Sequence, residues 1–91
     1  MEYPRYKHEL VLCRNKVYAI GGYTLNRAVS ASVEAYDANL DKWETKQAMN
    51  FPRADFTAHS ASENMPFIYV FGGTFDAFNV GMIERYDCDN N

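Results

Sequence analysis

The sequence has little of what would mark several large classes of protein. No run of apolar residues approaches the roughly 20 that a membrane-spanning helix needs. The N-terminus lacks the apolar stretch of a secretory signal peptide. Nine lysines and arginines stand against twelve acidic residues, for a net charge of −3, whereas a nucleic-acid-binding domain would carry a basic stripe. We therefore expect neither a membrane partner nor a nucleic-acid partner.

Cysteine is also scarce. The chain has only Cys13 and Cys88, which lie far apart and at no spacing typical of a metal site. We interpret both as free thiols rather than as a disulfide. Free thiols are typical of a reducing compartment, so the expected location is cytoplasmic.

A sustained apolar period of 3.6 residues is missing too, and a repeat of about 50 residues is present instead. Such a long period without a helical pattern indicates a β-repeat architecture. The matched segments are Pro4-Arg5 with Pro52-Arg53, Gly21-Gly22 with Gly72-Gly73, and Glu34-Ala35-Tyr36-Asp37 with Glu84-Arg85-Tyr86-Asp87.

The two copies differ in length at one place. Their offset rises from 48 at Pro-Arg to 51 at Gly-Gly, so the second copy has about three extra residues between these motifs. Hairpin tips tolerate insertions because the added backbone stays in water. We therefore place the insertion in a turn at residues 62–66, which would be longer than its counterpart at 14–16.

Apolar alternation and turn-forming residues predict seven strands. Four lie at residues 6–13, 17–20, 32–36 and 43–46, and three more at 56–61, 67–71 and 82–86. Residues 23–27 are expected to form a loop. Four antiparallel strands with short turns make one blade of a β-propeller.

The ordered motifs resemble the kelch repeat: a Pro-Arg start, an apolar run ending in Gly-Gly, a Tyr-Asp, and a tryptophan seven residues after the tyrosine. The resemblance implies an all-β fold, a partial kelch β-propeller with one four-stranded antiparallel blade plus three strands of a second. It implies a first repeat at residues 1–49 and a second, incomplete repeat at 50–91. The residues expected to serve the fold are Arg5, Gly21, Gly22, Tyr36, Trp43, Arg53, Gly72, Gly73 and Tyr86.

Both ends fall inside the repeat pattern. Met1 aligns with Met49, and a tryptophan equivalent to Trp43 would fall two residues beyond Asn91. Propellers have about four to eight blades, so we expect either a fragment of a longer protein or several copies closing one ring. Of the two we favour the fragment, with non-specific self-association through uncovered blade faces and edges.

Residues that would suggest catalysis have simpler interpretations. His8 and His59 have no carboxylate or cysteine beside them at ligand spacing. Glu34 and Glu84 could pass for a catalytic carboxylate pair, but they occupy one repeat position twice, which favours a structural or solvent-facing role. We expect no catalytic residue, no metal site and no cofactor.

The resemblance also implies a binding surface, because in kelch substrate adaptors the residues after Pro-Arg and after Gly-Gly line one mouth of the ring. It predicts a protein-interaction module that takes a protein or peptide partner, as the substrate-recruiting propeller of a BTB-kelch ubiquitin-ligase adaptor or as an actin-binding protein. The alternative is a fragment of a kelch-type enzyme, an oxidase or a sugar epimerase. The predicted partner-binding residues are Tyr6, Lys7, Tyr23, Thr24, Ala54, Asp55, Thr74, Phe75 and Asp76.

Overall fold

The computed structural model describes residues 4–62, 65–75, 78–79 and 81–89. This part of the chain is built from strands and turns and contains no helix, and hence none able to cross a membrane. Its strands are β1 (Arg5–Tyr6), β2 (Glu9–Cys13), β3 (Lys16–Ile20), β4 (Tyr23–Thr24), β5 (Val33–Asp37), β6 (Lys42–Lys46), β7 (Thr57–Ser62), β8 (Met65–Phe71), β9 (Thr74–Phe75), β10 (Phe78–Asn79) and β11 (Ile83–Asp87).

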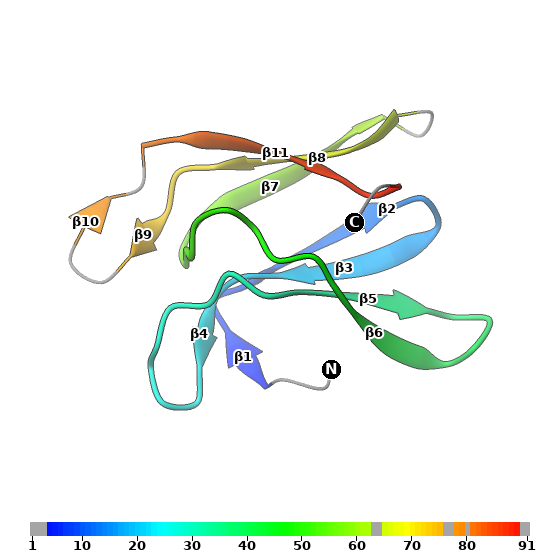
Figure 1. Ribbon diagram of the computed structural model, residues 1–91, viewed down its shortest axis with the longest axis horizontal. Coiled ribbons are helices and arrows are strands. Elements are labelled where there is room, and N and C mark those ends of the chain that lie inside the picture. Colours follow the sequence, from blue (N-terminus) through cyan, green and yellow to red (C-terminus); the bar gives the residue numbers. More distant parts are fainter. Residues whose placement is uncertain (1–3, 63–64, 76–77, 80, 90–91) are drawn as a thin grey trace.

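The strands form two larger sheets and two small ribbons, all with antiparallel neighbours (Figure 1). The first sheet has the order β2-β3-β5-β6, and the second has the order β7-β8-β11. The ribbons pair β1 with β4 and β9 with β10. This arrangement confirms the expected all-β architecture of a four-stranded blade followed by three strands of another.

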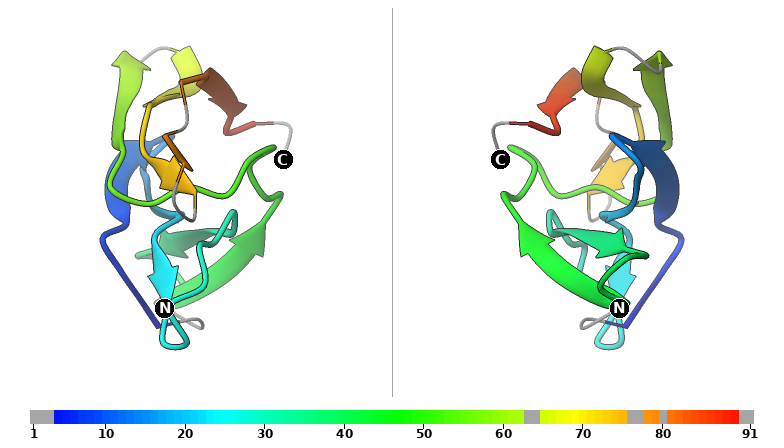
Figure 2. Two further views of the ribbon diagram at one scale, coloured as in Figure 1. Left: turned by 90° about the vertical axis from the view of Figure 1, so that its left-hand side faces the viewer. Right: turned by 90° about the vertical axis from the view of Figure 1, so that its right-hand side faces the viewer.

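The two larger sheets pack face to face, as the views along the sheets show (Figure 2). Alternate residues of each strand point into the shared core because successive side chains of a strand face opposite sides. The rings of Tyr18 and Tyr86 meet edge to face across this core, with centroids 6.2 Å apart. The buried core residues are Val11, Cys13, Tyr18, Ile20, Val33, Ala35, Met49, Phe56, Ala58, Ile68, Val70, Tyr86 and Cys88.

The expected strands are present, with two corrections in the first repeat and with the unpredicted strands β9 and β10 in the second. The strand predicted over residues 6–13 is divided into β1 and β2, because Lys7 takes a left-handed conformation with φ of 54°. The loop predicted over residues 23–27 begins with β4, which pairs with β1. Both differences come from pairing between short segments on either side of β2 and β3, which a local pattern does not reveal.

The three extra residues of the second repeat fall within residues 62–66, as predicted, but they lengthen the β7–β8 ladder rather than the turn. β7 and β8 together have three more residues than β2 and β3, whereas two residues separate the strands of each hairpin. Ser62 pairs with Met65, and a β-bulge lies between Ser60 and Ser62. The insertion extends the ladder because added residues there gain backbone pairing, and the bulge absorbs the change of register.

The cysteines also differ from expectation. Cys13, at the end of β2, and Cys88, just after β11, form a disulfide between the two sheets, with their Cα atoms 6.7 Å apart. The interpretation as two free thiols was wrong because sheet packing brings together residues 75 positions apart. The expected cytoplasmic location depended on free thiols and loses that support.

Candidate functional site

The β1–β4 ribbon places two of the predicted binding residues side by side. Tyr6 pairs with Tyr23 in the ribbon, and their rings stack with centroids 5.2 Å apart and planes at 29°. The Tyr6 side chain is exposed, and the Tyr23 side chain is half-buried. Thr24 lies next in the same strand, opposite Arg5. The pair forms an aromatic stack with two phenol hydroxyls, which suits apolar and hydrogen-bonding groups together.

The next two predicted residues join the repeats. Lys7 and Asp55 occupy equivalent positions, and each has a left-handed backbone, with φ of 54° and 55°. The Asp55 amide donates to the Lys7 carbonyl at 3.4 Å, and the Lys7 ammonium lies 3.7 Å from the Asp55 carboxylate. Both side chains are largely exposed, so this ion pair adds little to stability. It does cancel the two charges locally.

The start of the β9–β10 ribbon continues the surface into the second repeat. Ala54 and Thr74 exchange two backbone hydrogen bonds, of 3.0 and 2.8 Å, and the Thr74 hydroxyl donates to the Ala54 carbonyl. Phe75 follows Thr74 and is 41% exposed. Asp76, also predicted to bind, lies outside the described residues.

Two glycines allow these segments to approach. Gly22 has φ of 89°, and a Cβ there would lie 2.6 Å from the Tyr6 carbonyl oxygen. Gly73 has φ of 96°, and a Cβ there would lie 2.8 Å from the Ala54 carbonyl oxygen. Any larger residue would be strained in backbone conformation and would also clash. The Gly-Gly motif therefore holds the predicted binding residues of each repeat against the strand ends.

Together these contacts bring eight of the predicted residues to one end of the sheets, which faces the viewer in the left panel of Figure 2. Ala54 is fully buried there, so its prediction as a partner-binding residue was wrong. The other seven lie at the surface. We call this surface the ribbon surface. It offers aromatic and apolar groups, two threonine side chains and a neutralised ion pair, and so can bind but has no nucleophile held by a base. Its residues are Tyr6, Lys7, Tyr23, Thr24, Asp55, Thr74 and Phe75.

Beneath the ribbon surface, a buried ion pair ties the first repeat together. The Arg5 guanidinium donates to the Glu34 carboxylate at 2.7 Å, and both side chains are at most 1% exposed. The other Arg5 terminal nitrogen donates to the carbonyls of Ala19, Gly21 and Ser32 at 3.0–3.3 Å. Arg5 thus satisfies the carbonyls at the ends of β3 and β5 while its charge is neutralised.

The second repeat contains the same arrangement. Arg53 donates to Glu84 at 3.1 Å and to the carbonyls of Gly72 and Met82 at 3.0 and 2.9 Å. The second Glu84 oxygen accepts from the Asn50 amide. Both glutamates are therefore held in structural ion pairs, which is what their recurrence suggested, and neither is available for acid–base catalysis.

Sequence reasoning missed that these arginines and glutamates pair with each other. A signal was present: both residue types recur at matching offsets, and charged residues are seldom buried unless paired. A recurring Arg and a recurring Glu in core-facing segments are thus expected to form an ion pair with each other.

The histidines lie apart. His8 is half-buried beside Gly22, and its Nδ1 is buried with no hydrogen-bond partner among the described residues. Burial, followed by the nearby charge of Arg5, lowers the pKa of His8 below its ordinary value of 6.5. His59 is exposed on β7 and packs on Phe71, with ring centroids 6.4 Å apart. Within the described ranges, no three His, Cys, Asp or Glu residues are placed to hold a metal ion.

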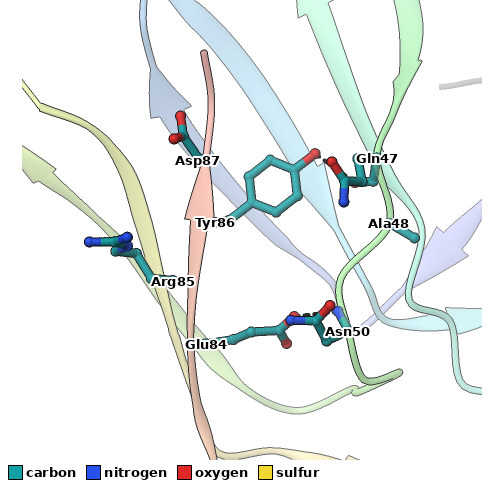
Figure 3. Close-up of a pocket in the computed structure, with 7 residues that line it drawn as sticks. All are labelled: Gln47, Ala48, Asn50, Glu84, Arg85, Tyr86 and Asp87. Carbon is teal, nitrogen blue, oxygen red and sulfur yellow. Dashed lines mark hydrogen bonds between the residues drawn. The ribbon is translucent and has the colours of Figure 1, made fainter. Parts of the chain in front are cut away.

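A pocket of about 160 Å³ lies between β11 and the segment after β6 (Figure 3). Glu84 and Tyr86 point into it, and Arg85 points to the other side of the strand. The Tyr86 hydroxyl donates to the Gln47 carbonyl at 2.6 Å, and burial raises the pKa of this tyrosine. The polar groups of the pocket therefore hold the connection between the sheets, which argues against a ligand site.

Comparison with known proteins gives one family match and several relatives. The model of the Kelch motif matches residues 4–50. An F-box/kelch-repeat protein of Arabidopsis thaliana is 30% identical over 82 residues, which are 90% of this chain and 22% of that protein. Another from the same plant is 33% identical over 84 residues, 92% of this chain and 21% of that protein.

Beta-scruin of Limulus polyphemus is 33% identical over 73 residues, which are 80% of this chain and 8% of that protein. The chain thus spans about a fifth of the length of the plant relatives and less than a tenth of the scruin.

Proposed function

Because the chain belongs to the kelch-repeat family, we propose that it is a protein-interaction module that binds a protein or peptide partner through the ribbon surface. The observation that carries this proposal is the stack of the exposed Tyr6 on the half-buried Tyr23 in the β1–β4 ribbon, next to the Lys7–Asp55 contact that joins the two repeats. Tyrosine side chains bury large areas at low entropic cost and are over-represented among residues that dominate binding energy.

The chemistry of the ribbon surface suggests the kind of segment it takes. Lys7 and Asp55 neutralise each other, so the surface carries no net charge from this pair to select a charged ligand. Phe75 and the tyrosine pair provide apolar area, and Thr24 and Thr74 provide hydroxyl groups at its edge. The expected partner segment is therefore apolar or aromatic, with polar backbone groups available for hydrogen bonds.

More specific roles are proposed only for a longer protein that contains these repeats. Two relatives are named F-box/kelch-repeat proteins, which supports kelch repeats that act beside another domain. Recruitment of a substrate in a BTB-kelch ubiquitin-ligase adaptor fits this pattern. Binding to actin is the second role that we propose for a longer protein. The enzyme alternative gains no support from the described residues, since their recurring glutamates are engaged with arginines.

The test measures binding of a selected peptide. Peptides are selected from a random display library on the purified chain, and the dissociation constant is measured by fluorescence anisotropy. We expect Tyr23→Ala and Phe75→Ala each to weaken binding at least tenfold, about 1.4 kcal/mol or more.

Leu40→Ala is the matched control because Leu40 is 66% exposed and lies in the β5–β6 turn, away from the ribbon surface. It should leave the dissociation constant unchanged. If both ribbon-surface variants kept wild-type affinity while Leu40→Ala lost it, binding would lie elsewhere and the proposal would fail.

A further inference from the structure

The Cys13–Cys88 disulfide links the two repeats at the end of the sheets opposite the ribbon surface. Cys13 is the last residue of β2, and the other end of this strand, at Glu9, comes shortly after β1 of the ribbon. Cys88 directly follows β11. Five residues of extended chain place the two ends of β2 about 15 Å apart. The disulfide therefore lies away from the proposed binding residues.

The repeat offsets show that the sheets form without a cysteine at either position. Cys13 corresponds to Ala61 of the second repeat, at an offset of 48, and Cys88 corresponds to Ala38 of the first, at an offset of 50. Alanine cannot form a cross-link, yet each repeat builds the same strands with it. The disulfide is thus an addition to the repeat and not a requirement of its fold.

Contacts other than the disulfide hold the two repeats together. The Gly22 amide donates to the Arg53 carbonyl at 2.9 Å, and the Arg53 amide donates to the Ser30 carbonyl at 3.2 Å. In the shared core, the rings of Tyr18 and Tyr86 meet edge to face. None of these contacts involves a sulfur atom, so we expect the sheets to stay packed when the disulfide is reduced.

The connections beside the disulfide are weaker than those at the ribbon end. The Arg14 guanidinium donates to the Asp89 carboxylate at 3.1 and 3.0 Å, with side chains that are 42% and 46% exposed. An ion pair this exposed contributes little to stability. The Tyr18 hydroxyl donates to the Cys88 carbonyl at 3.4 Å, which is long for such a bond. Reduction should therefore release the β2–β3 turn from the segment after β11.

The folded chain keeps the two sulfur atoms close even when they are reduced. Sheet packing sets the distance between the Cα atoms of Cys13 and Cys88 at 6.7 Å, although 75 positions separate them in the sequence. In the unfolded chain, joining them costs the entropy of closing this long loop. In the folded chain that cost is already met, so the bond can open and form again within one folded structure.

We propose that Cys13 and Cys88 form a reversible redox site that joins the two repeats at this end when oxidised and releases them there when reduced. The oxidant is a small-molecule disulfide of the glutathione type. One protein thiol loses its proton, and the thiolate attacks this disulfide, forming a mixed disulfide and releasing one glutathione thiolate, which takes up a proton.

The second protein thiol then reacts in the same way. Its thiolate attacks the protein sulfur of the mixed disulfide, the Cys13–Cys88 bond forms, and the second glutathione leaves as a thiolate and is protonated. Two protein thiols are oxidised, and one small-molecule disulfide is reduced to two thiols. The reverse sequence, driven by excess reduced glutathione, opens the site. Since the two cysteines are 3% and 8% exposed, exchange requires local opening, and equilibration takes place over hours.

A glutathione titration tests the reversibility. The purified chain, started either reduced or oxidised, is equilibrated in buffers of varied glutathione ratio. It is then quenched with acid, and its thiols are counted by alkylation and mass spectrometry. We expect both starting forms to reach the same oxidised fraction. The equilibrium constant for disulfide formation should be at least about 30-fold larger in native buffer than in 8 M urea, because folding holds the sulfur atoms together.

Hydrogen exchange tests what reduction releases. We expect faster amide exchange in the β2–β3 turn and around Cys88 after reduction, and no more than a twofold change at Gly22 and Arg53. Cys13→Ala/Cys88→Ala is the matched control because alanine stands at both equivalent positions of the repeat. It should show the exchange pattern of the reduced chain with or without reductant.

Three results would overturn the proposal. The first is a disulfide that glutathione opens only when the chain is unfolded, which would make it a permanent cross-link. The second is an equilibrium constant that is equal in native buffer and in urea. The third is exchange that, on reduction, increases equally throughout the chain or at no position. Because none of these measurements uses a bound peptide, each leaves the proposal for the ribbon surface standing.

Discussion

At equivalent positions of the two repeats, single residues keep the same backbone conformation even where their side chains differ. Lys7 and Asp55 have φ of 54° and 55°, and Gly22 and Gly73 have φ of 89° and 96°. The glycines recur because no other residue fits their positions. Aspartate tolerates the left-handed region better than lysine does, so the neighbouring contacts hold Lys7 in it.

At the scale of single residues, His8 gives a testable prediction about the pH dependence of stability. Its pKa is lowered in the folded chain by burial and then by Arg5, with a smaller opposing effect of Glu9. As pH falls through 6.5, the unfolded chain takes up a proton that the folded chain resists, so the free energy of unfolding decreases. The loss is complete once pH is below the lowered pKa.

Urea unfolding at a series of pH values measures how the free energy of unfolding changes with pH. We expect His8→Gln to flatten the decrease of stability between about pH 7 and the lowered pKa, while His59→Gln, which changes an exposed residue, leaves it as in wild type. An identical pH profile for His8→Gln and wild type would show that His8 is not the group responsible.

At the scale of strands, each repeat closes its ends with one arginine. Arg5 binds the ends of β3 and β5, and Arg53 does the same with Gly72 and Met82 in the second repeat. The partner glutamates differ in exposure: the Glu34 side chain is fully buried and that of Glu84 is 10% exposed. Removing one member of a buried pair leaves a charge without compensation, which costs more than the pair contributes.

We therefore expect Glu34→Gln to lower the free energy of unfolding by about 3 kcal/mol, and Glu84→Gln to lower it by less. Glu44→Gln is the matched control, because Glu44 is 60% exposed and its ion pair with Lys46 lies at the surface. It should change stability by no more than about 0.5 kcal/mol. Equal small losses for all three variants in urea unfolding would contradict a structural role for the buried pairs.

The strands themselves were largely predictable. Apolar alternation and the Gly-Gly motif located the strands of the two larger sheets to within a few residues, because side-chain period and turn chemistry are local properties. The short strand β4 was not predicted, and β1 was not separated from β2, because their pairing depends on contacts between separate segments. The strands β9 and β10 were not predicted either. The extension of β8 was missed for a related reason, since sequence spacing counts extra residues but does not say whether a turn or a ladder accepts them.

At the scale of the whole molecule, the two sheets are joined by a shared apolar core and by the Cys13–Cys88 disulfide. A disulfide stabilises mainly by restricting the unfolded chain, and more so when the enclosed loop is long. Here the cysteines are 75 residues apart, so nearly the whole chain is enclosed.

Reduction should therefore lower the free energy of unfolding by about 2–4 kcal/mol. Urea unfolding with and without dithiothreitol measures the loss, and Cys13→Ala/Cys88→Ala is the control, since it should be insensitive to the reductant. An equal response of both proteins would show that the disulfide contributes nothing.

The candidate site was likewise predicted in part from the repeat motifs and decided in part only by tertiary contacts. The repeat resemblance predicted that residues after Pro-Arg and after Gly-Gly share one surface, and the structure brings Tyr6 to Tyr23 and Lys7 to Asp55. The resemblance did not predict that those two charges would pair. That contact depends on the distance between segments 48 positions apart, which is set by sheet packing.

The sequence by itself determined the repeat, the strand content and the positions of the glycines and buried arginines, because these follow from local periodicity and from backbone conformations that few residues can adopt. Only the tertiary structure decided which faces of the two sheets meet and that Cys13 and Cys88 bond. These features depend on how sheets far apart in the sequence are oriented, and a pattern along one strand does not encode that orientation.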